Sequence, residues 1–207
     1  MTSSPFLDPE KDLDKERRRL PHWQQGHVWQ FVTWRLADSL PRDLLLQWQS
    51  ERAAWIARHP EPWNDAIAGE YGALFTDRIE LLLDAGHGSC VLSRPHVEGV
   101  VEECLRHFDG ERYRLGPFIV MPNHVHVLFQ PLSNHRLDKV LHGWKSYTAK
   151  AINLLLGVEG SLWQEDYWDR LIRSEKHWFA VMRYIERNPA CLPPGSYILG
   201  YGSGKEP

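Results

Sequence analysis

The stretch from Met121 to Phe129, MPNHVHVLF, limits the fold of this chain more than any other feature. If it forms a β-strand, side chains alternate between its two faces, so His124 and His126 share one face and Val125 and Val127 share the other. The apolar face can then bury against helices, while two neutral imidazoles on the opposite face suit a divalent metal ion. The spacing alone is equally compatible with buried histidines that bind nothing.

A second segment downstream, Trp178 to Pro189 (WFAVMRYIERNP), has helical spacing and ends at a proline, as helices often do. Tyr184 and Asn188 lie one turn apart on the flank of its apolar stripe. They offer an oxygen nucleophile and an oxygen metal ligand on one rigid element. The alternative is a half-buried tyrosine and an asparagine that caps the helix in the left-handed conformation. The stripe itself consists of Trp178, Val181, Met182 and Ile185.

Together these residues resemble the REP-associated tyrosine transposases, within the superfamily named for its histidine-hydrophobic-histidine motif. MPNHVHVLF is similar to the metal-binding strand of that family, KSYTAKAIN to the next helix, and YWDRLIRSEKH leading into RYIERNP to the nucleophile helix. The resemblance covers roughly residues 112 to 190, and Gly26 to Leu36 is similar to the opening strand. It implies that His124, His126 and Asn188 are metal ligands and that Tyr184 is the nucleophile.

The resemblance also implies an activity. Members of the family cleave and rejoin single-stranded DNA, including hairpins of short palindromic repeats, through a 5′-phosphotyrosine, with Mg²⁺ or Mn²⁺ as cofactor and as a monomer or a homodimer. Two alternatives stay open: a catalytically inactive hairpin-DNA-binding protein, and a metal-dependent phosphodiesterase without a covalent intermediate. Tyr147 and Tyr167 are rival nucleophiles, but neither has an amide one turn further on.

The net charge of −3 excludes a protein coated in positive charge, so any DNA-binding surface must be local. The three cysteines show no paired metal spacing and favour a reducing compartment. No apolar run approaches the length of a membrane span, so we expect a cytoplasmic protein. The resemblance implies a bacterial protein associated with the nucleoid. The candidate DNA-binding residues are Arg17, Arg18, Arg19, Lys145, Lys150, Arg173 and Arg183.

The order of expected helices and strands predicts an α+β fold, an antiparallel sheet covered by helices on one face. The resemblance implies that this sheet is ferredoxin-like, with the imidazole strand central and the tyrosine helix near its metal face. We expect a helix from Asn134 to Leu155 with Tyr147 on its core stripe, and Ser174 as the cap of the tyrosine helix. The expected organisation is a polar arm (1–25), one domain (26–192) with a helical insertion at about 41–96, and a turn-rich tail (193–207).

Overall fold

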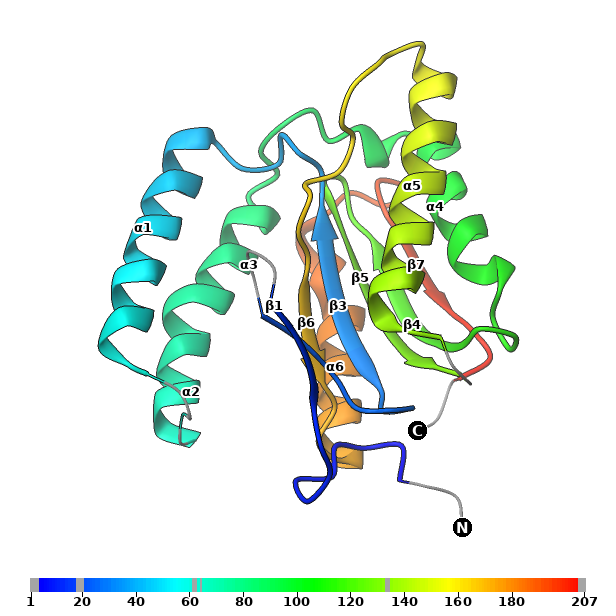
Figure 1. The fold of residues 1–207 in the computed structure, drawn as a ribbon. Helices are drawn as coiled ribbons and strands as arrows, with labels where there is room; N and C mark the ends of the chain where they lie inside the picture. The colour runs from blue at the N-terminus through cyan, green and yellow to red at the C-terminus, as the bar shows by residue number, and fades with distance from the viewer. Residues whose placement is uncertain (1–3, 18–20, 61–62, 64, 133–134, 205–207) are drawn as a thin grey trace. The chain divides into compact units, whose positions relative to one another are not determined.

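The computed structural model divides the chain into two compact units. One consists of residues up to 37 together with those from 91 onward, and the other consists of residues 38–90. The structure describes residues 4–17, 21–60, 63, 65–132 and 135–204 (Figure 1).

The first unit is built on a five-stranded antiparallel sheet with the strand order β6-β3-β5-β4-β7. Helix α4 connects β3 to β4, and helix α5 connects β5 to β6. The order of the first four strands and these two crossovers are those of a ferredoxin-like sheet, so the predicted α+β class is confirmed. The bounds are β3 (Gln30–Arg35), α4 (Pro95–His107), β4 (Tyr113–Val120), β5 (His124–Pro131), α5 (Leu137–Leu156), β6 (Trp168–Leu171) and β7 (Ile198–Tyr201).

Helices cover both faces of this sheet, not one face as the sequence pattern predicted. Helices α4 and α5 pack on the face to which β5 contributes Val125 and Val127. Helix α6 (Glu175–Arg187) packs on the other face, where β5 contributes Leu128. Figure 1 shows α5 in front of the sheet and α6 behind it. The prediction was wrong because every residue of β5 is buried, and a strand buried on both faces needs cover on both sides.

The core face of α5 differs from the predicted stripe. Thr148 and Ile152 continue the buried row that includes Leu141 and Trp144, following helical spacing. Tyr147, which was assigned to this stripe, is 58% exposed, and Leu154 is 86% exposed. The aromatic ring of Tyr147 therefore belongs to the surface of the helix.

The two outer strands were not predicted as strands. Strand β6 pairs with β3 and lies in an aromatic segment that ends at Leu171. Strand β7 pairs with β4 and lies in the segment that was expected to be only a turn-rich tail. Each has four residues, too few for an alternating pattern to be recognised. In β7 the pattern is further interrupted by Gly200, where a Cβ atom would collide with the Phe118 ring.

The expected polar arm also contains strands. Strands β1 (Asp14–Arg17) and β2 (Pro21–Gln24) pair antiparallel in a two-stranded sheet. A charged sequence such as DKER gives no strand signal, because β-propensity reflects half-buried apolar side chains.

The second unit is helical. Trp48 and Trp55 are its buried aromatic anchors, and the indole N–H of Trp48 donates to the carbonyl oxygen of Phe75 at 3.1 Å. The interpretation of this region as an insertion within one domain remains a prediction. Its elements are α1 (Arg42–Arg58), α2 (Asp65–Tyr71), a π-helical turn η1 (Gly72–Thr76) and α3 (Asp77–Asp84).

Short helical turns follow this unit and helix α6. They are η2 (Val91–Ser93) and η3 (Asn188–Cys191). Within the described part of the chain, no helix combines the length and the apolar character that crossing a membrane requires.

Candidate active site

Two imidazoles face each other on β5. The Nε2 atoms of His124 and His126 lie 3.0 Å apart, and both side chains are buried. Burial lowers the pKa of His124 to about 3, and burial together with the neighbouring His124 lowers the pKa of His126 well below its ordinary value. Both rings are therefore neutral near pH 7 and can offer a nitrogen lone pair to a ligand.

Each imidazole is oriented through its Nδ1 atom. Nδ1 of His124 lies 2.7 Å from the side-chain oxygen of Asn123, which can only accept, so Nδ1 carries the proton and Nε2 keeps a lone pair. Nδ1 of His126 lies 2.7 Å from the hydroxyl of Thr33 on β3, which can donate or accept. Such partners fix the tautomer and the direction of metal-binding histidines.

The sequence analysis missed both partners. Asn123 directly precedes His124 and could have been recognised there, whereas the role of Thr33 depends on the strand register. The antiparallel pairing places Thr33 opposite His126, and a register is not visible in one strand alone.

Helix α6 carries the tyrosine to this pair. The Ser174 hydroxyl caps the helix by accepting from the backbone N–H of His177 at 3.2 Å, as predicted. The apolar face buries Trp178 and Ile185 against the sheet, which leaves Tyr184 on the flank. The hydroxyl of Tyr184 lies 3.4 Å from Nε2 of His126, and its ring meets that imidazole at 74°.

Asn188 follows one turn after the tyrosine. Its backbone N–H donates to the carbonyl oxygen of Tyr184, and its φ of −52° is right-handed, so the left-handed cap considered from sequence is wrong. Its side-chain oxygen Oδ1 is buried without a hydrogen-bond partner in the part of the chain that the structure describes. A buried polar atom of this kind is costly unless something else satisfies it.

The donor set fits a divalent metal ion. It consists of two imidazole nitrogens that face each other, and the buried side-chain oxygen of Asn188, one turn after Tyr184, is a further candidate ligand. Neighbouring ligands of an octahedral ion at about 2.1 Å lie about 3.0 Å apart, which is the separation of the two Nε2 atoms. Among the described residues no three of the types His, Cys, Asp and Glu are grouped so that they could hold a metal ion.

The rival tyrosines lie elsewhere. Tyr147 is on α5, which covers the opposite face of the sheet. Tyr167 is buried, and its ring stacks on His22 with 4.0 Å between centroids. Of the three tyrosines considered from sequence, Tyr184 is the one that the structure places beside the imidazoles.

A buried charged cluster that the sequence did not indicate holds β2 against the segment of β6. His22 lies between two carboxylates, with Nδ1 2.5 Å from Asp169 and Nε2 3.1 Å from Asp166. Burial alone would lower the pKa of His22, but the hydrogen bonds and charges of both carboxylates outweigh it and raise the pKa to about 9. His22 is therefore a protonated structural residue near pH 7.

The candidate DNA-binding residues are divided between the two faces of the sheet. Arg173 and Arg183 are exposed beside and on α6, on the imidazole side. Lys145 and Lys150 are on α5, on the opposite side, and Lys145 donates to the carbonyl oxygens of residues 164 and 165 at 2.7 and 2.6 Å. The backbone of Arg17 belongs to β1. Arg18 and Arg19 lie outside the described residues.

Comparison with known proteins adds the following. Residues 91–188, nearly half of the chain, match the model of a family described as "Transposase IS200 like". A search of curated proteins gave no match. Two solved structures are similar at 15% identity. One is a REP-associated tyrosine transposase bound to a REP hairpin (TM-score 0.46, covering 86% of this chain and 73% of that one), and the other is a putative transposase from Deinococcus radiodurans (TM-score 0.37, 80% and 93%).

The matched segment begins directly after the helical unit of residues 38–90 and ends at Asn188. It includes both imidazoles and Tyr184. The segment of this protein that carries the candidate active site is therefore the part that matches the model of the IS200-like transposase family.

Proposed function

We propose that this protein is a metal-dependent transposase that cleaves and rejoins single-stranded DNA, with Tyr184 as the nucleophile. The observation that supports this most strongly is the position of the Tyr184 hydroxyl, 3.4 Å from Nε2 of His126, whose Nε2 faces that of His124 at 3.0 Å. A nucleophile next to a pair of neutral, oriented imidazoles is the arrangement that phosphoryl transfer assisted by a metal requires.

In the proposed reaction, Tyr184 attacks the phosphorus atom of a phosphodiester. A bond forms between the phenolic oxygen and phosphorus, and the bond from phosphorus to the 3′ oxygen breaks. The leaving oxygen takes up a proton and becomes a free 3′-hydroxyl, while the 5′-phosphate stays on the tyrosine. The phosphotyrosine linkage preserves the phosphodiester, so a second DNA 3′-hydroxyl can reverse the step without ATP.

His124, His126 and Asn188 are the proposed holders of Mg²⁺ or Mn²⁺. When bound, the ion supplies charge neutralisation for the phosphoryl oxygens and lowers the resistance of the phosphate to attack. Asn123 and Thr33 contribute by keeping the imidazole rings fixed.

Tyr184 must lose its proton in the reaction, because an ordinary phenol with a pKa near 10 is almost entirely protonated at neutral pH. Its position on the flank of a capped helix fixes the direction from which its oxygen approaches the substrate.

The proposed substrate is a hairpin formed by single-stranded DNA, bound by one subunit or by a homodimer. Support comes from the match to the IS200-like family and from the resemblance of the motif segments to REP-associated transposases. We accordingly propose that the protein acts at the nucleoid of a bacterial cell. Exposed Arg183, next to the nucleophile, supplies positive charge toward the DNA backbone.

A cleavage assay with end-labelled hairpin DNA in Mn²⁺ tests the proposal. A strand labelled at its 3′ end should migrate as a protein adduct in a denaturing gel, and one labelled at its 5′ end should give a shorter free fragment. Tyr184→Phe should abolish both products. Tyr167→Phe, at a buried ring in the core on the opposite face of the sheet, should leave both unchanged.

Other outcomes would overturn the proposal. Cutting without an adduct indicates a phosphodiesterase that uses water. Tight hairpin binding by a folded protein that cuts in neither Mn²⁺ nor Mg²⁺ indicates a binding protein. An adduct that persists in Tyr184→Phe identifies another tyrosine, which peptide mapping of the adduct would reveal.

A further inference from the structure

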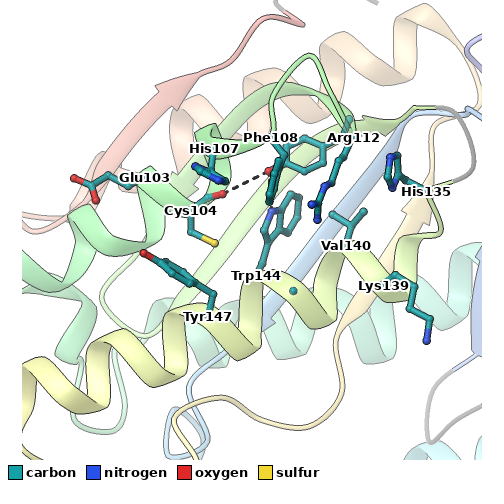
Figure 2. Close-up of a pocket in the computed structure, with 12 residues that line it drawn as sticks. Glu103, Cys104, His107, Phe108, Arg112, His135, Lys139, Val140, Trp144 and Tyr147 are labelled. Carbon is teal, nitrogen blue, oxygen red and sulfur yellow. Dashed lines mark hydrogen bonds between the residues drawn. The ribbon is translucent and has the colours of Figure 1, made fainter.

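A cavity of about 420 Å³ lies between α4 and α5, on the face of the sheet opposite the imidazoles (Figure 2). The apolar side chains of Cys104, Phe108 and Trp144 line its inner part. The proposed reaction at Tyr184 uses none of these residues. The cavity is therefore a separate feature of the matched domain.

The polar groups on the floor of the cavity form hydrogen bonds within the protein. The indole N–H of Trp144 donates to the hydroxyl of Tyr113 at 3.0 Å, and that hydroxyl donates to the carbonyl oxygen of Leu105 at 2.9 Å. Tyr113 and Trp144 are buried, at 1% and 3% exposure, and these hydrogen bonds leave the floor of the cavity apolar. A flat aromatic ligand suits such a surface better than a polar one.

The rim of the cavity is basic. Arg112 stacks on the ring of Phe108, with its guanidinium carbon 3.4 Å from the ring centroid, and still has N–H groups that can point outward. The ammonium group of Lys139 lies 3.8 Å from Asp138, and its side chain is 77% exposed. Glu103 is the one carboxylate among the lining residues. Figure 2 shows Arg112 and Lys139 at the same end of the cavity.

A glycine in the middle of α5 keeps the cavity open. A Cβ atom on Gly143 would have no atom within 4 Å, so packing does not require a glycine there. A glycine inside a helix costs roughly 0.5–1 kcal/mol relative to alanine. The next turn of the same face carries Tyr147, whose ring is 58% exposed and lines the cavity. The helix thus leaves a gap beside an exposed aromatic ring.

We infer that this cavity binds one unpaired nucleotide of a DNA strand. The nucleobase stacks against the exposed ring of Tyr147, and the phosphate groups on either side of it meet Arg112 and Lys139. Ring stacking combined with a basic rim is the general chemistry of single-strand recognition. The inference rests on the proposed function only for the identity of the ligand as DNA, because the cavity shares no residue with the proposed cleavage site.

Binding of a labelled oligothymidylate without a hairpin, in EDTA, tests the inference apart from cleavage. Fluorescence anisotropy gives its Kd for wild type and for two matched variants. Gly143→Leu fills the cavity and should weaken binding by about tenfold or more, the effect of losing a base stack. Gly99→Leu, on α4 and also with no atom within 4 Å of an added Cβ, should change the Kd by less than about twofold.

Photocrosslinking identifies the contact directly. An oligothymidylate with one 5-iododeoxyuridine should crosslink to the α5 peptide that contains Trp144 and Tyr147, and Gly143→Leu should remove this crosslink. Equal Kd values for wild type and Gly143→Leu, or crosslinks confined to other peptides, would overturn the inference. Binding of thymidine monophosphate without binding of the oligonucleotide would also overturn it.

The two proposals fail in different ways. If the cavity does not bind DNA, the Tyr184 adduct still forms on hairpin substrates while the α5 crosslink is absent. If the transposase proposal is wrong, the adduct is absent while the crosslink in EDTA remains.

Discussion

The hydroxyl of Thr33 lies 2.7 Å from Nδ1 of His126, across the pairing of β3 with β5. In the metal-free protein, Nε2 of His126 can donate to the lone pair on Nε2 of His124, and Thr33 then donates to Nδ1. When Nε2 binds a cation instead, the proton must sit on Nδ1 and the hydroxyl must accept. Because the Thr33 hydroxyl can either donate or accept, it can orient the imidazole of His126 with and without a bound cation.

We therefore expect Thr33→Val to weaken Mn²⁺ binding by about 10–100-fold, because the isosteric side chain cannot accept from Nδ1. The same change should lower the free energy of unfolding by about 1–3 kcal/mol, since it leaves a buried nitrogen unsatisfied. Titration calorimetry and denaturant unfolding measure the two effects. Thr33→Ser keeps the hydroxyl and should retain most of the affinity, and equal Mn²⁺ affinity in the valine variant would contradict the assigned role.

Substitution of Asn188 should reduce activity with little change in stability. Its buried Oδ1 has no hydrogen-bond partner among the described residues, so Asn188→Ala removes an unsatisfied atom and should change the free energy of unfolding by less than about 1 kcal/mol. Adduct formation should fall at least about 100-fold, because the proposed metal ligand is lost. Asn188→Asp, which keeps an oxygen ligand, should recover Mn²⁺ binding. A large loss of stability with unchanged cleavage in the alanine variant would assign the residue a structural role.

The stabilising contribution of His22 should be lost in alkaline solution. Its pKa is raised from the ordinary 6.5 to about 9 by Asp166 and Asp169, so the folded state holds the proton more tightly than the unfolded chain does. This contribution is fully present below about pH 6.5 and is lost as the pH rises through 9. We expect a loss of about 1–3 kcal/mol of unfolding free energy between pH 7 and pH 9.5. His22→Gln should flatten this dependence, and an unchanged pH profile in the variant would contradict the assignment.

Substitution of Arg183 should weaken DNA binding, whereas substitution of Lys145 should lower stability, although both residues were candidates for DNA contact. Exposed Arg183→Ala should weaken hairpin binding several-fold and reduce the slope of log K against log salt by about one, with no change in stability. Lys145→Met should instead destabilise the fold by about 1.5–3 kcal/mol, because its ammonium group binds two carbonyl oxygens. Anisotropy at several salt concentrations and thermal unfolding distinguish the two roles. A full loss of DNA binding in a stable Lys145→Met would reverse this assignment.

The sequence predicted best those features that depend on local periodicity. Alternation within MPNHVHVLF was enough to predict that His124 and His126 share a face, and the cap at Ser174 was visible from its position before an apolar period. Features that depend on pairing between distant segments were not predictable. Thr33 becomes a partner of His126 only through the register of two strands, across a separation of 93 residues. His22 meets its carboxylates across even longer separations of 144 and 147 residues.

Periodicity also failed where a helix has more than one apolar face. In α5 the spacing of Tyr147 is compatible with the core stripe, yet the sheet takes the neighbouring positions Trp144 and Thr148. Which face of a helix packs against the sheet depends on the packing of all its side chains and not on any single one.

Strand β7 pairs with the outer side of β4, so the chain itself occupies an edge that would otherwise be open to strands of other molecules. The new edge that β7 presents has only four residues and contains Gly200, which makes it a poor template for intermolecular pairing. A second copy that paired with the outer side of β4 would have to displace the segment that ends in Tyr201. Self-association by continuation of the sheet is thereby disfavoured at this edge.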